Sequence, residues 1–214
     1  MIKPHGSDTL NPLYVADEAA HGQLVQEAAE LPAITVSSAA AANAVMLGAG
    51  YFNPLTGYMT KADALSVARD MRTASGLFWP IPIVNIVADP ESIRGAARIA
   101  LKDPNVEGEP VIAVQDVEGI EEISDEEMRD MVTHIFGTDD EEHPGVATFK
   151  GLGRYLVHGP IQVLNFSYFE NDFRDTFRTP QSIRDEFAER GWDKVVAFQT
   201  RNPMHRAHEE LCRM

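Results

Sequence analysis

The feature that most constrains the fold is a change of pattern near residue 168. Before it, short apolar runs alternate with helical stretches, two of which begin at Thr60 and Ser124. After it, a helical stretch, an apolar run and a second helical stretch follow in order, as in sheets that are covered by helices. We therefore expect one mixed α/β domain over residues 1–168 and the start of a second domain over residues 169–214.

Helices are expected first over residues 15–30 and 37–50, where alanines and larger apolar residues recur at helical spacing. A loop rich in Pro and Gly follows, and Thr60 then caps a third helix. We expect the apolar side of this third helix to include Val67 and Met71.

Strands are expected over residues 81–87, which are rich in β-branched residues, and over residues 97–102 and 111–117. The second and third of these runs are separated by turn residues, so we expect an antiparallel hairpin. Residues 154–166 form another expected strand, interrupted by Gly159-Pro160.

A capping box begins a further helix at Ser124, with Glu127 three residues later and Gly137 as the stop. The acidic run at residues 139–142 follows this helix. A metal ion would need oxygen ligands from elsewhere in the fold, so we interpret this run as a solvated loop.

Composition excludes several classes of protein. No stretch approaches the roughly 20 apolar residues of a membrane helix, and the N-terminus has no apolar signal core, so we expect a cytoplasmic protein without membrane partners. A single cysteine, Cys212, offers neither an internal disulfide nor a thiolate-rich zinc site. The net charge is -15. Residues 1–168 hold 10 Lys or Arg against 24 Asp or Glu, which disfavours nucleic acid as a partner.

Residues 169–214 are nearly neutral, with 8 basic against 9 acidic residues. Thr179 caps an expected helix that Gly191 ends, residues 194–198 form an expected apolar strand, and a helix starts near His205. A strand, a short loop and a helix in this order direct free backbone N–H groups at a ligand beyond the strand, so we expect a phosphate site here.

The residues at this corner have the chemistry of an anion site. His205 and His208 are three residues apart, so they lie on one helical face, and Arg201 offers a planar fork to an oxyanion. As a zinc pair, the histidines would lack the Glu of His-Glu-x-x-His. The cluster consists of seven residues, of which Arg206 is expected to face outward: Gln199, Thr200, Arg201, Asn202, His205, Arg206 and His208.

The run Phe198-Gln-Thr-Arg-Asn-Pro203 with His205-Arg-Ala-His-Glu209 resembles the signature of ATP sulfurylases, which are nucleotidyltransferases with a His-x-x-His motif. Other segments agree with that family, so the resemblance covers nearly the whole chain. They are His5-Gly6, Asn53-Pro-Leu-Thr-Gly-Tyr-Met59, Trp79-Pro-Ile-Pro82 and His143-Pro-Gly-Val146.

The resemblance implies a PUA-like domain over residues 1–168 and the first strand, loop and helix of a Rossmann-like catalytic domain over residues 169–214. It implies the reaction of ATP with sulfate to give adenosine 5′-phosphosulfate and pyrophosphate, usually with Mg²⁺ and without a metal held by the protein. It also implies a homo-oligomer.

The resemblance gives the motif residues separate roles. His205 and His208 are expected to stabilise the pentacoordinate α-phosphate, and the remaining histidines are expected to be structural. The catalytic set is Thr200, Arg201, Asn202, His205 and His208, and the set that binds sulfate and ATP is Gln199, Arg201 and Asn202.

One departure from the family pattern is that the chain stops at Met214, whereas the family's second nucleotide-binding segment, a Gly-Arg-Asp-His-like loop, lies well downstream. We therefore expect little or no turnover from residues 1–214 alone. Two alternatives stay open: another His-x-x-His adenylyltransferase, and an RNA-binding PUA module. The physiological direction of the reaction and a following kinase domain also stay open.

Overall fold

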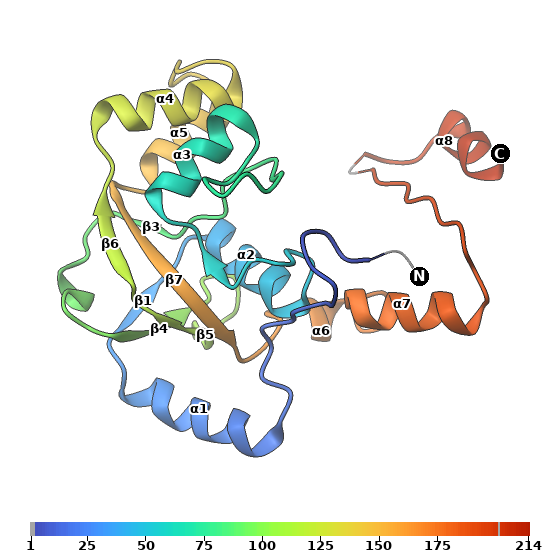
Figure 1. Ribbon diagram of the computed structural model, residues 1–214, viewed down its shortest axis with the longest axis horizontal. Helices are drawn as coiled ribbons and strands as arrows, with labels where there is room; N and C mark the ends of the chain where they lie inside the picture. The colour runs from blue at the N-terminus through green and yellow to red at the C-terminus, as the bar shows by residue number, and fades with distance from the viewer. Residues whose placement is uncertain (1–2, 201) are drawn as a thin grey trace.

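The computed structural model describes residues 3–200 and 202–214. A curled sheet with helices around it forms a body, and the C-terminal segment extends from that body (Figure 1). The helices are α1 (Glu18–Glu30), α2 (Ser38–Ala49), α3 (Lys61–Asp70), α4 (Asp125–Phe136), α5 (Pro144–Gly151), α6 (Phe169–Asp172), α7 (Pro180–Glu189) and α8 (Arg206–Arg213), with a 3-10 helix at Glu91–Ile93. The strands are β1 (Ala33–Thr35), β2 (Gly57–Tyr58), β3 (Ile86–Val87), β4 (Arg98–Lys102), β5 (Val111–Asp116), β6 (Gly119–Glu122) and β7 (Tyr155–Val163).

Strand β7 is the centre of the sheet. The strand order is β1-β4-β5-β7-β2, and β3 and β6 also pair with β7. Strand β1 runs parallel to β4, whereas β4 and β5 form an antiparallel hairpin. The expected mixed α/β class and this hairpin are therefore confirmed.

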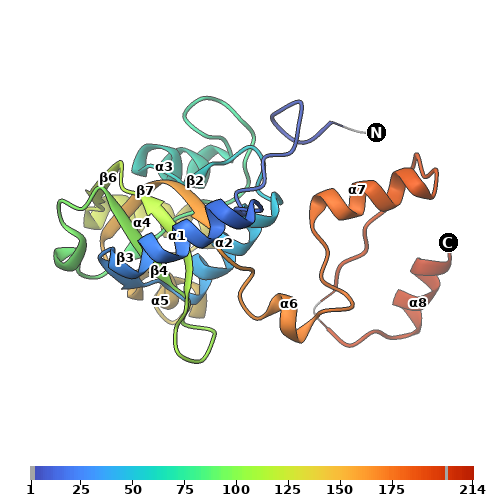
Figure 2. The ribbon, with the colours of Figure 1, turned by 90° about the horizontal axis from the view of Figure 1, so that it is seen from below.

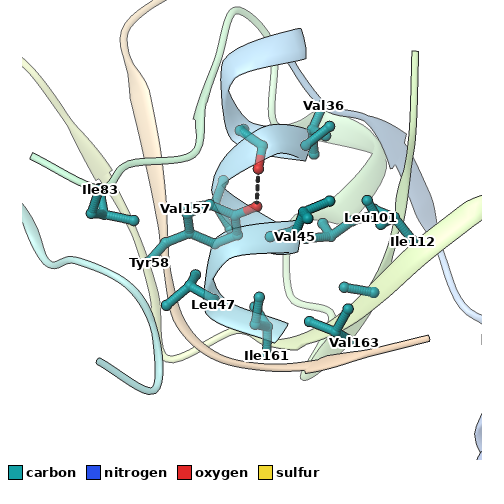
Figure 3. Packing of buried hydrophobic residues seen from close by; sticks show 14 of the residues in the cluster. Val36, Val45, Leu47, Tyr58, Ile83, Leu101, Ile112, Val157, Ile161 and Val163 are labelled. Atoms are coloured by element: carbon teal, nitrogen blue, oxygen red, sulfur yellow. Dashed lines mark hydrogen bonds between the residues drawn. The ribbon is translucent and has the colours of Figure 1, made fainter. Parts of the chain in front are cut away.

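Helix α2 packs on the sheet and fills the main core (Figure 3). It begins at Ser37, whose hydroxyl accepts from the Ala40 N–H, and it ends at Gly50 in the left-handed conformation. A Cβ added at Gly48 would lie 2.7 Å from Val163, so the helix can approach β7 closely only because that position is glycine. The buried hydroxyl of Tyr58 donates to the Ala40 carbonyl at 2.8 Å.

A second core lies under α3, α4 and α5, where Ile123, Met131 and Leu156 are fully buried. Helix α4 has the expected capping box between Ser124 and Glu127. Burying each large apolar side chain in these cores stabilises the folded state by roughly 1.5–3 kcal/mol. This packing stabilises the helices more than their weak local propensity does. Among the residues that the structure describes, no helix is both long and apolar enough to cross a membrane.

Three expectations about local structure were wrong or only partly right. Strand β7 runs without interruption through Gly159, whose φ of 135° and missing side chain let the Asp116 carbonyl approach. Met71 is 52% exposed because it follows α3 in the left-handed conformation, away from the buried side of that helix. Of residues 81–87, only β3 is a strand, because Pro82 cannot donate to a ladder.

We predict that Gly159→Ala and Gly22→Ala have opposite effects on the free energy of unfolding. A Cβ at Gly159 would lie 2.1 Å from the Asp116 carbonyl oxygen, so this variant should lose roughly 3 kcal/mol. Gly22 lies in α1 with nothing near its added Cβ, so its variant should gain about 0.5–1 kcal/mol. Urea unfolding of both variants checks this, and equal effects would contradict the close approach at β7.

A second prediction concerns pH. The Ser124 N–H, and then the Lys61 ammonium at 3.0 Å, hold the pKa of Glu127 below its ordinary value. A lowered folded-state pKa stabilises the protein above the unfolded pKa of about 4.3, and this stability is lost as the pH falls through the folded value.

The variant Glu127→Gln keeps an acceptor for the Ser124 N–H but has no charge, so it should be less stable than the parent at pH 7. The difference should disappear in acid. Glu126→Gln, one residue earlier on α4, is the matched control. A difference that persisted below pH 3 would show that the charge of Glu127 does not matter.

Candidate functional site

The C-terminal segment leaves the body at an aromatic cluster next to α2. The rings of Phe166 and Phe177 have centroids 5.3 Å apart, and Phe169 and Phe177 lie at 6.0 Å. The Tyr51 hydroxyl donates to the Arg178 carbonyl at 2.7 Å. Burial raises the pKa of Tyr51, so the hydroxyl keeps the proton that it donates. The chain is therefore fixed to the body up to residue 178.

Helix α7 follows this anchor and points away from the body (Figure 2). Thr179 caps it by accepting from the Ser182 N–H, and Pro180 occupies its first turn, as expected. Beside the helix lies a hollow of about 650 Å³ with mostly apolar walls. Its lining includes Tyr51, Ile183, Phe187, Trp192 and Val195.

The strand expected over residues 194–198 is not formed. These residues have no regular structure, and Val196 is 92% exposed. An apolar run becomes a strand only when a neighbour satisfies its backbone N–H and C=O groups, and within residues 3–200 and 202–214 no strand pairs with this run. The loop and helix of the expected unit are present, but its strand is absent from the described structure.

The first half of the motif forms a local turn. The Thr200 hydroxyl accepts from the Asn202 N–H and contacts the Asn202 carbonyl, both at 3.2 Å. Gln199 and Asn202 are exposed to solvent. Arg201, the expected oxyanion fork, lies outside the described residues.

The second half of the motif begins α8. His205 is the N-cap, and the centroids of the His205 and His208 rings are 3.9 Å apart, with an angle of 36° between the planes. The His205 backbone N–H donates to His208 Nδ1 at 3.3 Å, and the Phe198 ring lies 5.7 Å from the His208 ring. The structure thus brings the two expected histidines together with Phe198, which the sequence placed in the motif but not among the site residues.

The electrostatics of this corner suit an anion. The first backbone N–H groups of α8 and its helix dipole place partial positive charge beside the imidazoles. Glu209, an acid in the first turn, pairs with Arg213 at 2.6 Å, which offsets its charge. A phosphoryl group at the histidines would therefore meet donors and a favourable field.

Three histidines outside the motif form hydrogen bonds within the body. His143 caps α5 by accepting from two backbone N–H groups, which shows how His143-Pro144 can start a helix. His5 Nε2 and His21 Nε2 each form a hydrogen bond with a backbone carbonyl at 2.8 Å.

The acidic run lies in a loop, where Lys150 pairs with Glu141 at 2.9 Å. No group of three or more metal-ligating side chains that could hold an ion occurs among the described residues. The interpretation of this run as a solvated loop agrees with its exposure.

Two family models match the chain. A PUA-like domain model matches residues 2–166, and an ATP-sulfurylase model matches residues 174–214, which include the histidine pair. The PUA-like model covers most of the chain, so this part of the assignment does not depend on the motif.

Relatives match over the whole chain. Proteins named sulfate adenylyltransferase from Alcanivorax borkumensis and Allochromatium vinosum are 64% and 59% identical over 214 residues. The chain covers 53% and 54% of these two proteins, so it spans about half the length of the relatives it matches.

A solved structure described as a hexameric APS kinase from Thiobacillus denitrificans matches 99% of this chain and 36% of its own. The TM-score is 0.73 and the sequence identity is 28%. The fold class expected from the sequence is therefore confirmed. The chain belongs to the PUA-like domain family through residues 2–166, and its residues 174–214, which carry the motif, match the ATP-sulfurylase family model.

Proposed function

We propose that the protein is a sulfate adenylyltransferase. A sulfate oxygen attacks the α-phosphorus of ATP, the new bond gives adenosine 5′-phosphosulfate, and the bond to the β-phosphate breaks to release pyrophosphate. The observation that carries this proposal is the pair of adjacent histidine rings at the start of α8, next to the turn of Thr200 and Asn202. Relatives that are 54% to 64% identical and carry this name support it.

The residues around the turn bind the two substrates, sulfate and ATP. Gln199 and Arg201 hold sulfate, because an amide donor and a guanidinium fork match a tetrahedral dianion. Thr200 and Asn202 orient the reacting groups, and Asn202 together with Gln199 and Arg201 binds the substrates. Transfer between two oxyanions needs positioning and charge stabilisation, and no side-chain nucleophile is required.

The histidine pair acts on the α-phosphate. His205 and His208 lie where the dipole of α8 adds to their donors, and the transition state carries more charge on the equatorial oxygens than ATP does. Hydrogen bonds from the histidines that strengthen as this charge develops lower the energy of the transition state and so accelerate the reaction. Both directions of the reaction pass through the same transition state, so the site serves formation of activated sulfate and formation of ATP alike.

Magnesium is proposed to enter with ATP. The described motif residues are amides, a hydroxyl and imidazoles, a donor set that suits anions better than a hard cation. Phosphate oxygens and water would be its ligands, and the ion would neutralise the charge of the phosphates. No step is assigned to an ion held by this chain.

We also propose a homo-oligomer located in the cytoplasm, where ATP and sulfate meet. The support for assembly is the structural similarity to a protein described as hexameric.

The domain boundary is proposed near residue 168, between the two matched segments. The Tyr51 hydroxyl then joins the PUA-like domain to the start of the catalytic domain, because its acceptor, the Arg178 carbonyl, directly precedes Thr179, the N-cap of α7.

We predict that Tyr51→Phe, which removes only this hydroxyl, speeds amide hydrogen exchange at the start of α7 and lowers stability by about 1 kcal/mol. The matched control is Tyr58→Phe, whose hydroxyl bonds within the body. It should lower global stability without a selective effect on α7. Unchanged exchange near residue 178 in the Tyr51 variant would show that this bond does not fix the junction.

The catalytic prediction is tested on the protein expressed from its complete reading frame. The assay measures ATP formed from adenosine 5′-phosphosulfate and pyrophosphate. Arg201→Ala and His208→Ala should each lower kcat by about 10²–10³-fold, because each removes a donor to developing charge. Arg190→Ala, which removes an exposed arginine paired with Glu186, should keep activity.

Each other result points elsewhere. A folded parent without activity would move the assignment to another adenylyl acceptor, and retention of RNA at moderate salt would favour the RNA-binding alternative. An equal loss in the Arg190 control would remove the support for a localised site.

A further inference from the structure

The two histidines of the motif have different relations to α8. His205 is the N-cap, whereas His208 lies at the third helical position and its Nδ1 accepts from the His205 backbone N–H at 3.3 Å. Helix α4 shows the same arrangement with a carboxylate, where Glu127 accepts from the Ser124 N–H at 2.8 Å. His208 therefore occupies the place that Glu or Gln has in a capping box.

This contact defines the tautomer of the neutral His208 ring. A ring nitrogen that accepts a hydrogen bond carries no proton, so the proton of the neutral ring is on Nε2. A proton on Nδ1 would face the His205 N–H and leave the first turn of α8 without this cap.

The ring contacts of His208 also restrict its orientation. The centroid of its ring lies 3.9 Å from the centroid of the His205 ring and 5.7 Å from that of the Phe198 ring. The capping box of α8 is reciprocal, because the His205 side chain in turn faces the His208 backbone N–H.

We infer that His208 has two functions at once: its Nδ1 caps α8, and this contact commits its Nε2–H as the donor to an oxyanion. In the reaction proposed above, on which this assignment of the oxyanion rests, that anion is the α-phosphate.

The tautomer is measured by long-range ¹H–¹⁵N correlation spectra of the complete protein with ¹⁵N-labelled histidine, at neutral pH and without substrates. The loss of signals in His205→Gln and His208→Gln variants assigns the pair. We expect an unprotonated Nδ1 and a protonated Nε2 for His208. A protonated Nδ1 at His208 would overturn the inference, whatever reaction the protein catalyses.

The two functions can be separated by substitution. Asn places an acceptor near the position of Nδ1, and Gln places a donor near the position of Nε2. His208→Asn should keep hydrogen-exchange protection at the start of α8 and lose about 10²-fold in kcat, whereas His208→Gln should lose protection and keep more activity. If the Asn variant were the more active of the two, His208 would have only a structural role.

Cys212→Ser, at an exposed position later in α8, is the control and should leave the protection of the first turn unchanged. If the parent shows no sulfate-dependent release of pyrophosphate, the proposed function fails, yet the tautomer measurement still decides the inference.

Discussion

The backbone of β7 is the constraint on which the rest of the body depends. Four strands pair with it, and its alternating side chains supply two different cores. Val157 and Ile161 point into the core covered by α2, whereas Leu156 belongs to the core under α4. A strand that serves two cores cannot shift its register by one residue, because every side chain would move to the wrong side.

A buried polar chain fixes this register further. The Asn85 amide donates to Gln115 Oε1 at 3.2 Å, Gln115 Nε2 donates to the Val157 carbonyl at 3.1 Å, and the Val157 N–H donates to the Asn85 carbonyl at 2.8 Å. Asn85 and Gln115 are both fully buried, so a register that broke these bonds would leave polar groups unpaired in the core. Apolar packing alone would tolerate more alternatives than this network does.

The sequence predicted those elements whose signals are local. Helices α2, α3, α4 and α7 all begin at a Ser or Thr cap, which is visible within four residues. Strands β1 and β6 were missed because three or four residues carry too little periodicity, and α5 was missed because its cap is a histidine. Gly159 was misread as an interruption because its reason, the approach of the Asp116 carbonyl, comes from a residue 43 positions away in sequence.

The candidate site follows the same division between local and distant contacts. His205 and His208 meet because they are three residues apart at the start of a helix, so their proximity could be predicted from the sequence. The hydrogen bond by which His208 Nδ1 caps α8 could not be predicted, because it depends on the orientation of the ring. Residues 194–198 show the opposite case, because an apolar run specifies a strand only when a partner strand is present. The chemistry of the motif is thus encoded within ten residues, whereas its position relative to the body depends on distant contacts such as the bond from Tyr51 to Arg178. On the proposed function, substitutions far from the histidines can therefore alter catalysis without changing any group that touches a substrate.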